Sequence, residues 1–451
     1  MNAEELLEIA TGAVCRAPAQ CAVEVFISHS TDVTAKVAGG RLEQFHTSDS
    51  SGAGVRVIRD GRLGFAGTTD LTPDGLRRAV RAASDNAIGI ADAAHVLPEP
   101  AAPAAAPLLL PAGWVSAVPE AIVAAAFDLD RLTMAAHRDV QRTAPVMVGQ
   151  EVSRTAIASN LGVRCAHERS DAYATVSAVA RRGEERQTGL GFSLHPDLAG
   201  LDLEHAAREA AWRSAGQLGA VKPRTGEAPI VLDPLATARL LAAIAPALSG
   251  ESVHHGTSLW RDLTGERIAS PVLSLVDDGT LPGGPATAPV DDEGVPCRRT
   301  PLVEDGRLRG FLHSTESAAR AAAGTRSTGN GRRTGFRSQP GVLPGNLHVT
   351  GPTTPRRELL NGAGDALYVL DLKGAHSGVS TVTGDVSVGV KGHWLHGGEP
   401  AEPVRELTLA TSLDQLLGSV TSIGDDLRFF PLEHSVGGAT LACGPVPLSG
   451  A

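Results

Sequence analysis

Five consecutive segments between residues 21 and 70 constrain the fold most. They alternate apolar and polar residues and each ends at Gly, Asp or Ser: CAVEVFIS, DVTAKVAGG, RLEQFHTSD, GAGVRVIRDG and RLGFAGTTD. Neighbouring side chains of a strand point to opposite faces, so this alternation predicts half-buried strands. Asp60-Gly61 supplies the positive φ values that a tight hairpin turn needs. The region therefore predicts a meander of short antiparallel strands.

The rest of the first half predicts helices around further strands. Helical periodicity covers residues 3–14, and TPDGLRRAVRAASDNA (72–87) begins with a Thr cap followed by Pro. Two more helices are expected at about 118–137 and 201–218, with three strands between 145 and 192. The Pro/Ala-rich stretch 97–113 predicts an ordered crossover or a semi-rigid linker without regular structure. We expect an N-terminal α/β domain over residues 1–220.

The second half has a different pattern. APIVLDP predicts a strand, and LATARLLAAIAPALSG (235–250) predicts an amphipathic helix ended by Gly250. Short strands separated by Gly, Pro and Asp turns follow to the end. We expect an antiparallel barrel-like or sandwich β domain over residues 221–451, and an α+β protein overall.

Composition excludes several functional classes. The formal net charge is −10 over 451 residues and no long Lys/Arg cluster occurs, which argues against nucleic acid as a partner. The five cysteines are single and widely spaced, as expected of reduced thiols in a cytoplasmic protein. The N-terminus lacks the basic and apolar regions of a signal peptide, and no apolar run is long enough for a membrane span.

Histidine pairs are the first candidates for a metal site. His254 and His255 lie in ESVHHGTSLW, His167 precedes Glu168, and His393 and His396 flank a predicted hairpin. A helical zinc site needs two His on one face and a third ligand. Adjacent side chains diverge in an extended segment, so a structural or solvated role is the stronger interpretation, with metal ligation the alternative.

Carboxylates and a cysteine are the second set of candidates. VDDGTLPGG and VDDEGVPCRR place Asp277, Asp278, Asp291, Asp292 and Glu293 close in sequence. Such groups can perform acid/base chemistry or bind a hard cation, but they also cap turns, which we favour. Cys297, before two arginines, is the least implausible thiolate. STGNGRRTG (327–335) lacks the end of a phosphate loop and predicts a flexible loop facing substrate.

Taken together, long segments of the chain resemble the TldD/PmbA family. The segments are GTSLWRDLTGERIASPVLSLVDDGTLPGG, DDEGVPCRRTPLVEDGRLRGFLHSTESAARAAAG, STGNGRR, PGNLHVTG, GDVSVGVKGHWLHGGEPAEPVRELTLA and LLGSVTSIGDDLRF. SSGAGVRVIRDGRLGFAGTTDLTPDGLRRAV resembles the family's N-terminal domain. The resemblance implies a two-subunit zinc peptidase with the active site facing an internal cavity. The TldD-type subunit carries HExxxH and a C-terminal Cys, whereas the TldE/PmbA-type subunit lacks these ligands.

This sequence departs from the metal-bearing pattern. The family spacing, counted back from Ser258, places the motif on LAAIAP, so Leu241, Ala242 and Pro246 stand where His, Glu and His are expected. The Cys-bearing segment should follow GDDL (424–427), but RFFPLEHSVGG follows instead, and Cys443 comes too late. PGNL likewise indicates the metal-free type. We therefore expect no catalytic residue, metal or cofactor in this chain, with zinc in a TldD-like partner.

The resemblance thus implies a non-catalytic TldE/PmbA-like subunit of a heterodimeric zinc metallopeptidase. It would shape the cavity and bind a peptide or amide substrate, held like an added strand. The expected substrate-binding residues are Asn330, Arg332, Arg333, Asn346 and Ser380. High Ala, Arg and Gly content suggests an actinobacterial source, where such pairs resemble enzymes of natural-product pathways, lincosamides included. The alternative is a non-hydrolytic binding or assembly protein that acts as a homodimer.

Overall fold

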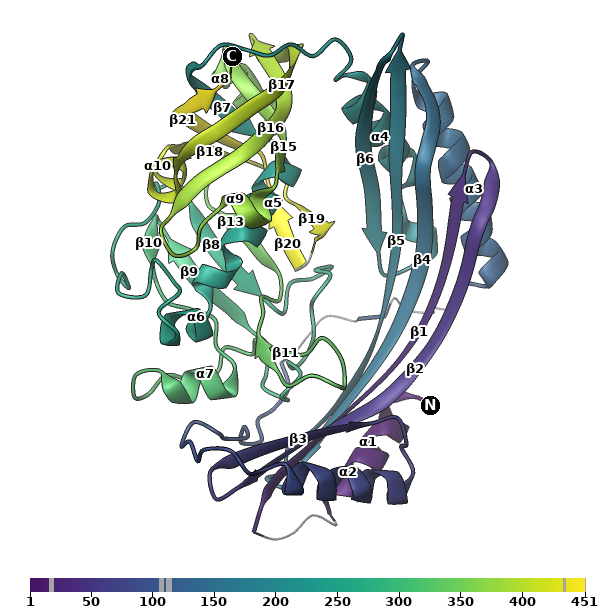
Figure 1. The fold of residues 1–451 in the computed structure, drawn as a ribbon, viewed down its shortest axis with the longest axis vertical. Helices are drawn as coiled ribbons and strands as arrows, with labels where there is room; N and C mark the ends of the chain where they lie inside the picture. The colour runs from purple at the N-terminus through teal and green to yellow at the C-terminus, as the bar shows by residue number, and fades with distance from the viewer. Residues whose placement is uncertain (16–19, 105–108, 111–115, 433–434, 451) are drawn as a thin grey trace.

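The computed structural model describes residues 1–15, 20–104, 109–110, 116–432 and 435–450. A single six-stranded antiparallel sheet organises the first half (Figure 1). Its strands are β1 (Ala22–Ala38), β2 (Arg41–Arg59), β3 (Arg62–Thr68), β4 (Val140–Ser159), β5 (Arg164–Arg182) and β6 (Glu185–His195). Their order across the sheet is β3-β2-β1-β4-β5-β6. The β2–β3 turn has the predicted positive φ at Asp60 and Gly61.

The prediction of five short strands between residues 21 and 70 was wrong in their number and length. The first two predicted segments are one strand, β1, and the next two are one strand, β2, paired in unbroken register from Ala22↔Ile58 to Lys36↔Gln44. The Ser, Thr and Asp residues that resemble turns lie within these strands. Residues 28, 30 and 32 of β1 alternate with buried residues that face the helices, so they line the opposite face of the sheet.

Four helices cover one face of this sheet: α1 (Ala3–Val14), α2 (Pro73–Asp85), α3 (Pro119–Ala136) and α4 (Leu203–Ala215). All four were predicted to within a few residues, because local signals mark their ends. Asn2 and Glu5 form a capping box at α1, and the Thr72 side chain caps α2 with Pro73 in its first turn. Helices α1 and α2 pack on the half of the sheet near β3, and α3 and α4 on the other half.

A closed ring of five strands organises the second half, which confirms a barrel-like β structure. The ring comprises β7 (Gly226–Leu232), β15 (Ala366–Lys373), β16 (Asp385–His396), β17 (Glu399–Ser412) and β21 (Leu441–Ser449). It closes because β7 pairs with both β15 and β21. The prediction of a wholly antiparallel domain was wrong for one pair of strands, because β7 and β15 are parallel. β18 (Val420–Gly424) and β14 (Thr353–Thr354) extend it beyond β21.

A second six-stranded sheet lies beside the ring, in the order β10-β9-β8-β13-β20-β19. Its strands are β8 (Ser274–Asp278), β9 (Arg299–Glu304), β10 (Arg307–Leu308), β13 (Leu347–Thr350), β19 (Arg428–Pro431) and β20 (Ser435–Gly438). The pair β11 (Gly331–Arg332) and β12 (Gly341–Val342) stands apart. Short helices also lie between successive strands of the second half: α7 (Thr315–Arg320), α8 (Arg356–Ala363), α9 (Ala375–Gly378) and α10 (Leu413–Gly418).

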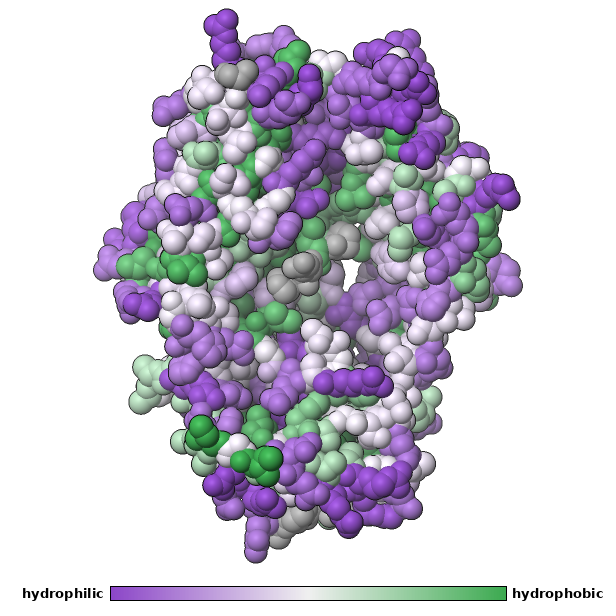
Figure 2. All heavy atoms as spheres, in the orientation of Figure 1, coloured by the Kyte–Doolittle hydropathy of each residue, from purple (hydrophilic) through white to green (hydrophobic). Residues whose placement is uncertain are grey.

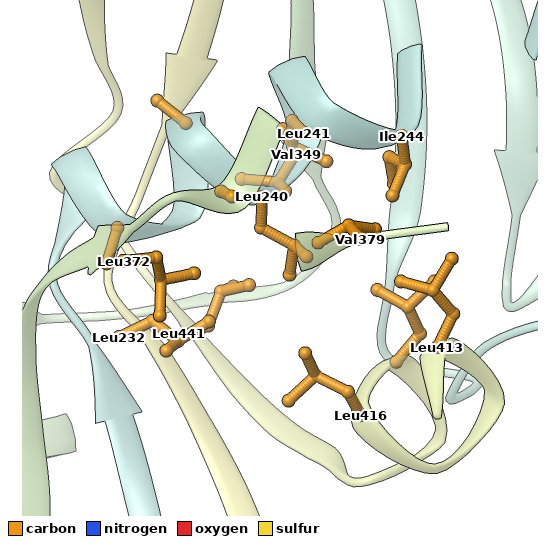
Figure 3. Close-up of a cluster of buried hydrophobic side chains, with 14 of the residues drawn as sticks. Leu232, Leu240, Leu241, Ile244, Val349, Leu372, Val379, Leu413, Leu416 and Leu441 are labelled. Carbon is orange, nitrogen blue, oxygen red and sulfur yellow. The ribbon is translucent and has the colours of Figure 1, made fainter. Parts of the chain in front are cut away.

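Helix α5 (Pro234–Ile244) packs between the ring and the second sheet, with contacts to β7 and β15 on one side and to β13, β19 and β20 on the other. Leu240, Leu241 and Ile244 point into the large core of this half (Figure 3). The predicted helix 235–250 ends earlier, since Pro246 cannot donate the next helical hydrogen bond. A 3₁₀ turn, Ala245–Leu248, follows, and Gly250 begins α6 (Gly250–His254) instead of ending α5.

The structure describes part of the predicted linker. Residues 97–104 have no regular structure, whereas residues 105–108 and 111–115 lie outside the described residues. The expected domain boundary near residue 220 stays a prediction. Among the described residues, no helix combines the length and the apolar character needed to cross a membrane.

Candidate functional site: a cleft between the two halves

A cleft of about 670 Å³ lies between the first sheet and the second half. One wall is formed by residues 169–173 of β5 and residues 192–196 at the end of β6, and the facing wall by residues 283–285 and 427–429. Figure 2 shows the molecule hollowed between its halves at this level. Phe192, Leu194 and Phe429 make much of the lining apolar, with Arg169 and Asp171 among its polar groups. The cleft can therefore hold a partly apolar, extended ligand.

Three carboxylates lie side by side on the face of the first sheet that the helices leave open. Glu151 of β4 is directly opposite Asp32 of β1 and directly opposite Asp171 of β5, which lines the cleft. Partial burial, followed by the charges of Asp171 and Asp32, raises the pKa of Glu151. Like charges in opposite positions destabilise a sheet, and Arg169 offsets part of this repulsion because its guanidinium pairs with Asp171 at 2.7 Å.

Two terminal strands border the cleft. β6 is the last strand of the first sheet and β19 the last strand of the second sheet. The Arg428 guanidinium donates to the Phe192 carbonyl at 2.7 Å and stacks over the Phe192 and Phe430 rings, joining the two strands. Terminal strands have unpaired backbone groups, which can bind an extended peptide by strand addition.

A buried network of charges joins the two halves below the cleft. Glu24 of β1 lies opposite Arg56 of β2, and the Arg56 guanidinium donates to both Glu24 carboxylate oxygens at 3.0 and 2.6 Å. Arg56 also pairs with Glu293 of the second half at 3.0 Å, and Arg333 pairs with Glu24 from the other direction. Arg56, Glu24 and Glu293 are at most 3% exposed. The network therefore fixes the turns around 291–297 and 331–333 to the first sheet.

Carboxylates outnumber cations in this network. Arg56, Arg332 and Arg333 face Glu24, Asp277, Asp291, Asp292 and Glu293. Asp291 is fully buried and accepts hydrogen bonds from the backbone of residues 293, 295 and 331. Burial, and next the charge of Glu293, raise the pKa of Asp291 to about 8. The folded network therefore retains a proton near neutral pH.

We expect the free energy of unfolding to fall by about 1 kcal/mol per pH unit between about pH 6 and 8. The unfolded chain releases the Asp291 proton near pH 4, whereas the folded chain retains it up to a pKa of about 8. The contribution of Asp291 to stability is thus fully present below the unfolded pKa and is lost as pH rises through the folded pKa. Urea unfolding at several pH values measures this slope. Glu293→Gln removes the charge that most raises the Asp291 pKa, so its slope should be shallower. A wild-type stability that is level or rises over this range would contradict the assignment.

The structure brings three of the five expected substrate-binding residues into this network. Asn330 is buried and donates to Asp277 and to the Leu343 carbonyl, and Arg333 pairs with Glu24. Arg332 lies beside Cys297, its Nη2 3.5 Å from the sulfur. These side chains already have partners within the chain, and their role in substrate binding stays a prediction.

Asn346 and Ser380 lie elsewhere. The fully buried Asn346 side chain binds the Asp278 carbonyl, Thr287 and the backbone of Ala286, so it holds the loop that forms one cleft wall. Ser380 follows α9 and accepts a hydrogen bond from the Thr383 backbone within its own turn. Neither observation tests substrate binding.

Glu24 and Arg56 were not among the candidate residues predicted from the sequence. The available signal was a single charge in the middle of each of two apolar runs, AVEVFI and GVRVI. The favoured turn role is confirmed for Asp278 and Asp291, whose carboxylates accept backbone hydrogen bonds two residues ahead. The Asp292 carboxylate accepts the backbone N–H of Arg333, whereas Glu293 pairs with the Arg56 guanidinium.

The histidine and cysteine candidates have local partners. His254 and His255 are exposed, and their rings contact each other at 5.2 Å between centroids. The expectation of an extended segment was wrong here, because His254 ends the short helix α6. His393 is buried beside Gln217, and His396 is exposed between Asp365 and Glu402. Burial raises the pKa of the Cys297 thiol to about 12, so it is not an activated nucleophile.

Groups of three or more His, Cys, Asp or Glu placed to hold a metal ion are absent from the described part of the chain. At the positions of the expected HExxxH motif, Leu241 is 1% exposed in the core, Ala242 is half-buried and Pro246 is exposed. Helix α5 thus offers hydrocarbon where a metal-bearing subunit would need nitrogen and oxygen donors.

Three family models together match most of the chain. Residues 225–449 match the PmbA/TldA metallopeptidase C-terminal domain, residues 23–87 match domain 1 and residues 115–218 match the central domain. The chain belongs to the PmbA/TldD metallopeptidase family. Metalloprotease PmbA of Escherichia coli O157:H7 is 24% identical over 417 residues, covering 90% of this chain and 88% of that protein.

Solved structures of the PmbA/TldD fold are similar over almost the whole chain. TldE from Thermococcus kodakarensis superposes with a TM-score of 0.89 at 23% identity and covers 99% of both chains. A Thermotoga maritima protein proposed to modulate a DNA gyrase has a TM-score of 0.85 at 22% identity, over 95% of this chain and 96% of its own. These likenesses establish the shared fold.

Proposed function

We propose that this chain is the metal-free, TldE/PmbA-like subunit of a two-subunit zinc metallopeptidase. The observation that carries the proposal is the chemistry of helix α5. The resemblance places HExxxH at residues 241–246, where the chain has Leu241, Ala242 and Pro246 and where Leu241 is buried in the core. A catalytic zinc site needs three protein ligands and an open position, and this helix supplies none of them. Zinc and the catalytic Glu would come from a HExxxH-bearing partner.

The role proposed for this chain is to complete the cavity and to hold part of the substrate. The cleft supports this role because it is open, partly apolar and bordered by the terminal strands β6 and β19. An extended peptide could add to either strand, with an apolar side chain near Phe192, Leu194 and Phe429. A small amide-bearing substrate is the second substrate class for the same cleft.

Co-expression with a HExxxH-bearing relative should give a 1:1 complex that contains zinc and cleaves peptides. This chain alone should neither bind zinc nor cleave peptides. Light scattering, zinc analysis and a peptidase assay on the same sample measure this. A complex in which the partner's HExxxH Glu is replaced by Gln is the matched control for activity. Hydrolysis by the purified chain alone would overturn the proposal. A homodimer that does not bind the partner and does not cleave peptides would favour the binding or assembly alternative.

A further inference from the structure

Lysine is rare in this chain, and its distribution is uneven. Of the 40 basic residues only four are lysines: Lys36, Lys222, Lys373 and Lys391. Two of the four lie on neighbouring strands of the ring, where Lys391 of β16 is opposite Asp371 of β15 and Lys373 is two residues further along β15. Both line one small cavity. Although most basic residues of this chain are arginines, two of its few compact ammonium groups lie at the same cavity.

The cavity has a volume of about 140 Å³ and lies where the ring meets the first sheet and helix α5. Thr188 and Gly189 of β6, Arg239 of α5, and the two lysines line it. The Lys391 ammonium donates to the Thr188 carbonyl, which leaves further N–H donors on Lys391. A water occupies about 30 Å³ of liquid, so the cavity has the size of a few waters or one small anion.

Positive charge around this cavity exceeds negative charge. Asp371 forms an ion pair with Arg239 at 2.6 Å, and Arg213 forms ion pairs with Glu209 and Asp233. Within the part of the chain that the structure describes, neither Lys373 nor Lys391 has a carboxylate at ion-pair distance. Burial, and then the charge of Lys373, lower the pKa of Lys391 to about 8, with Asp371 acting against them and Arg213 with them. A bound anion would relieve both effects.

We propose that this cavity is a binding site for a small oxyanion, held between Lys373 and Lys391 with Arg239 at its edge. The group recognised is either a free tetrahedral ion such as phosphate or a carboxylate carried by a ligand. Ammonium groups at a half-buried site bind such oxygens through charge-assisted hydrogen bonds, which are stronger than neutral ones. The site lies outside the cleft, and its existence does not depend on the peptidase role.

The small number of lysines makes a direct test possible. Protein labelled with ¹³C at lysine Cε gives four side-chain signals, which Lys→Arg variants assign. At constant ionic strength, inorganic phosphate should raise the pKa of Lys391 by about one unit, which corresponds to about tenfold tighter binding to its protonated form. Lys36 and Lys222 should not respond. Binding should weaken as pH rises through the pKa of Lys391, because the neutral amine attracts the anion less.

Acetate in place of phosphate distinguishes the two sources of the oxyanion. A response to acetate alone would assign a carboxylate ligand, and a response to phosphate alone a tetrahedral ion. Lys373→Met should abolish the response while the other three signals keep their folded positions, and Lys222→Met is the matched control that should retain it. If neither anion moves the Lys391 titration, or if all lysines respond alike, the proposal is wrong.

Discussion

Replacing Arg56 with methionine is expected to lower the free energy of unfolding by about 3–5 kcal/mol. The guanidinium is 3% exposed and lies between Glu24 and Glu293, which are 1% and 0% exposed. Methionine fills part of the space but leaves Glu293 without its cation and leaves Glu24 with Arg333 alone. An uncompensated buried charge costs far more than the net contribution of the pair, which explains the expected size. Urea unfolding at pH 7 measures the loss.

Arg59→Met is the matched control, because Arg59 lies on the same strand but is exposed, and its guanidinium donates to the Ser84 hydroxyl at 3.4 Å. Its effect should stay within about 0.5 kcal/mol. A loss at Arg56 no larger than the loss at Arg59 would show that the buried network does not hold the two halves together. Combining Arg56→Met with Glu293→Gln should recover part of the loss, since the carboxylate that Arg56 alone pairs by salt bridge in the described residues then carries no charge.

Local signals allowed the helices of the first half to be predicted from sequence. Caps and proline positions fix α1 and α2 within a few residues of their ends, and these signals depend on contacts inside one turn. The strands were harder to predict, because β1 and β2 bear polar residues on the face of the sheet that the four helices leave uncovered. Without knowledge of that uncovered face, Ser28 to Asp32 and Thr47 to Ser51 are indistinguishable from turns.

The arrangement of the candidate site depends on contacts that sequence spacing does not reveal. Glu24 meets Arg333 across 309 positions, and Arg428 meets Phe192 across 236. The pairing that closes the ring joins β7 to β21, which lie at opposite ends of the second half of the sequence. The carboxylates at 291–293 were recognised as close together, yet nothing in their spacing separates Asp291, which caps a turn, from Glu293, which binds Arg56.

Leu241→His is expected to lower the free energy of unfolding by about 4 kcal/mol, because it removes a buried leucine and buries an imidazole without a partner. Leu241 is 1% exposed and packs in the large core of the second half (Figure 3). The substitution places histidine at the first position of the expected zinc motif. The loss should therefore persist when zinc is added, since the surrounding side chains are hydrocarbon. Thermal and urea unfolding with and without zinc measure it.

Pro246→His is the matched control, as it introduces the same residue at the last position of the expected motif, where the side chain is exposed. We expect a change of about 1 kcal/mol or less there. The contrast bears directly on the proposed division of roles between two subunits. If Leu241→His were as stable as Pro246→His, or gained stability from stoichiometric zinc, helix α5 would face a site that can hold metal. Catalytic zinc would then not need to come from a partner subunit.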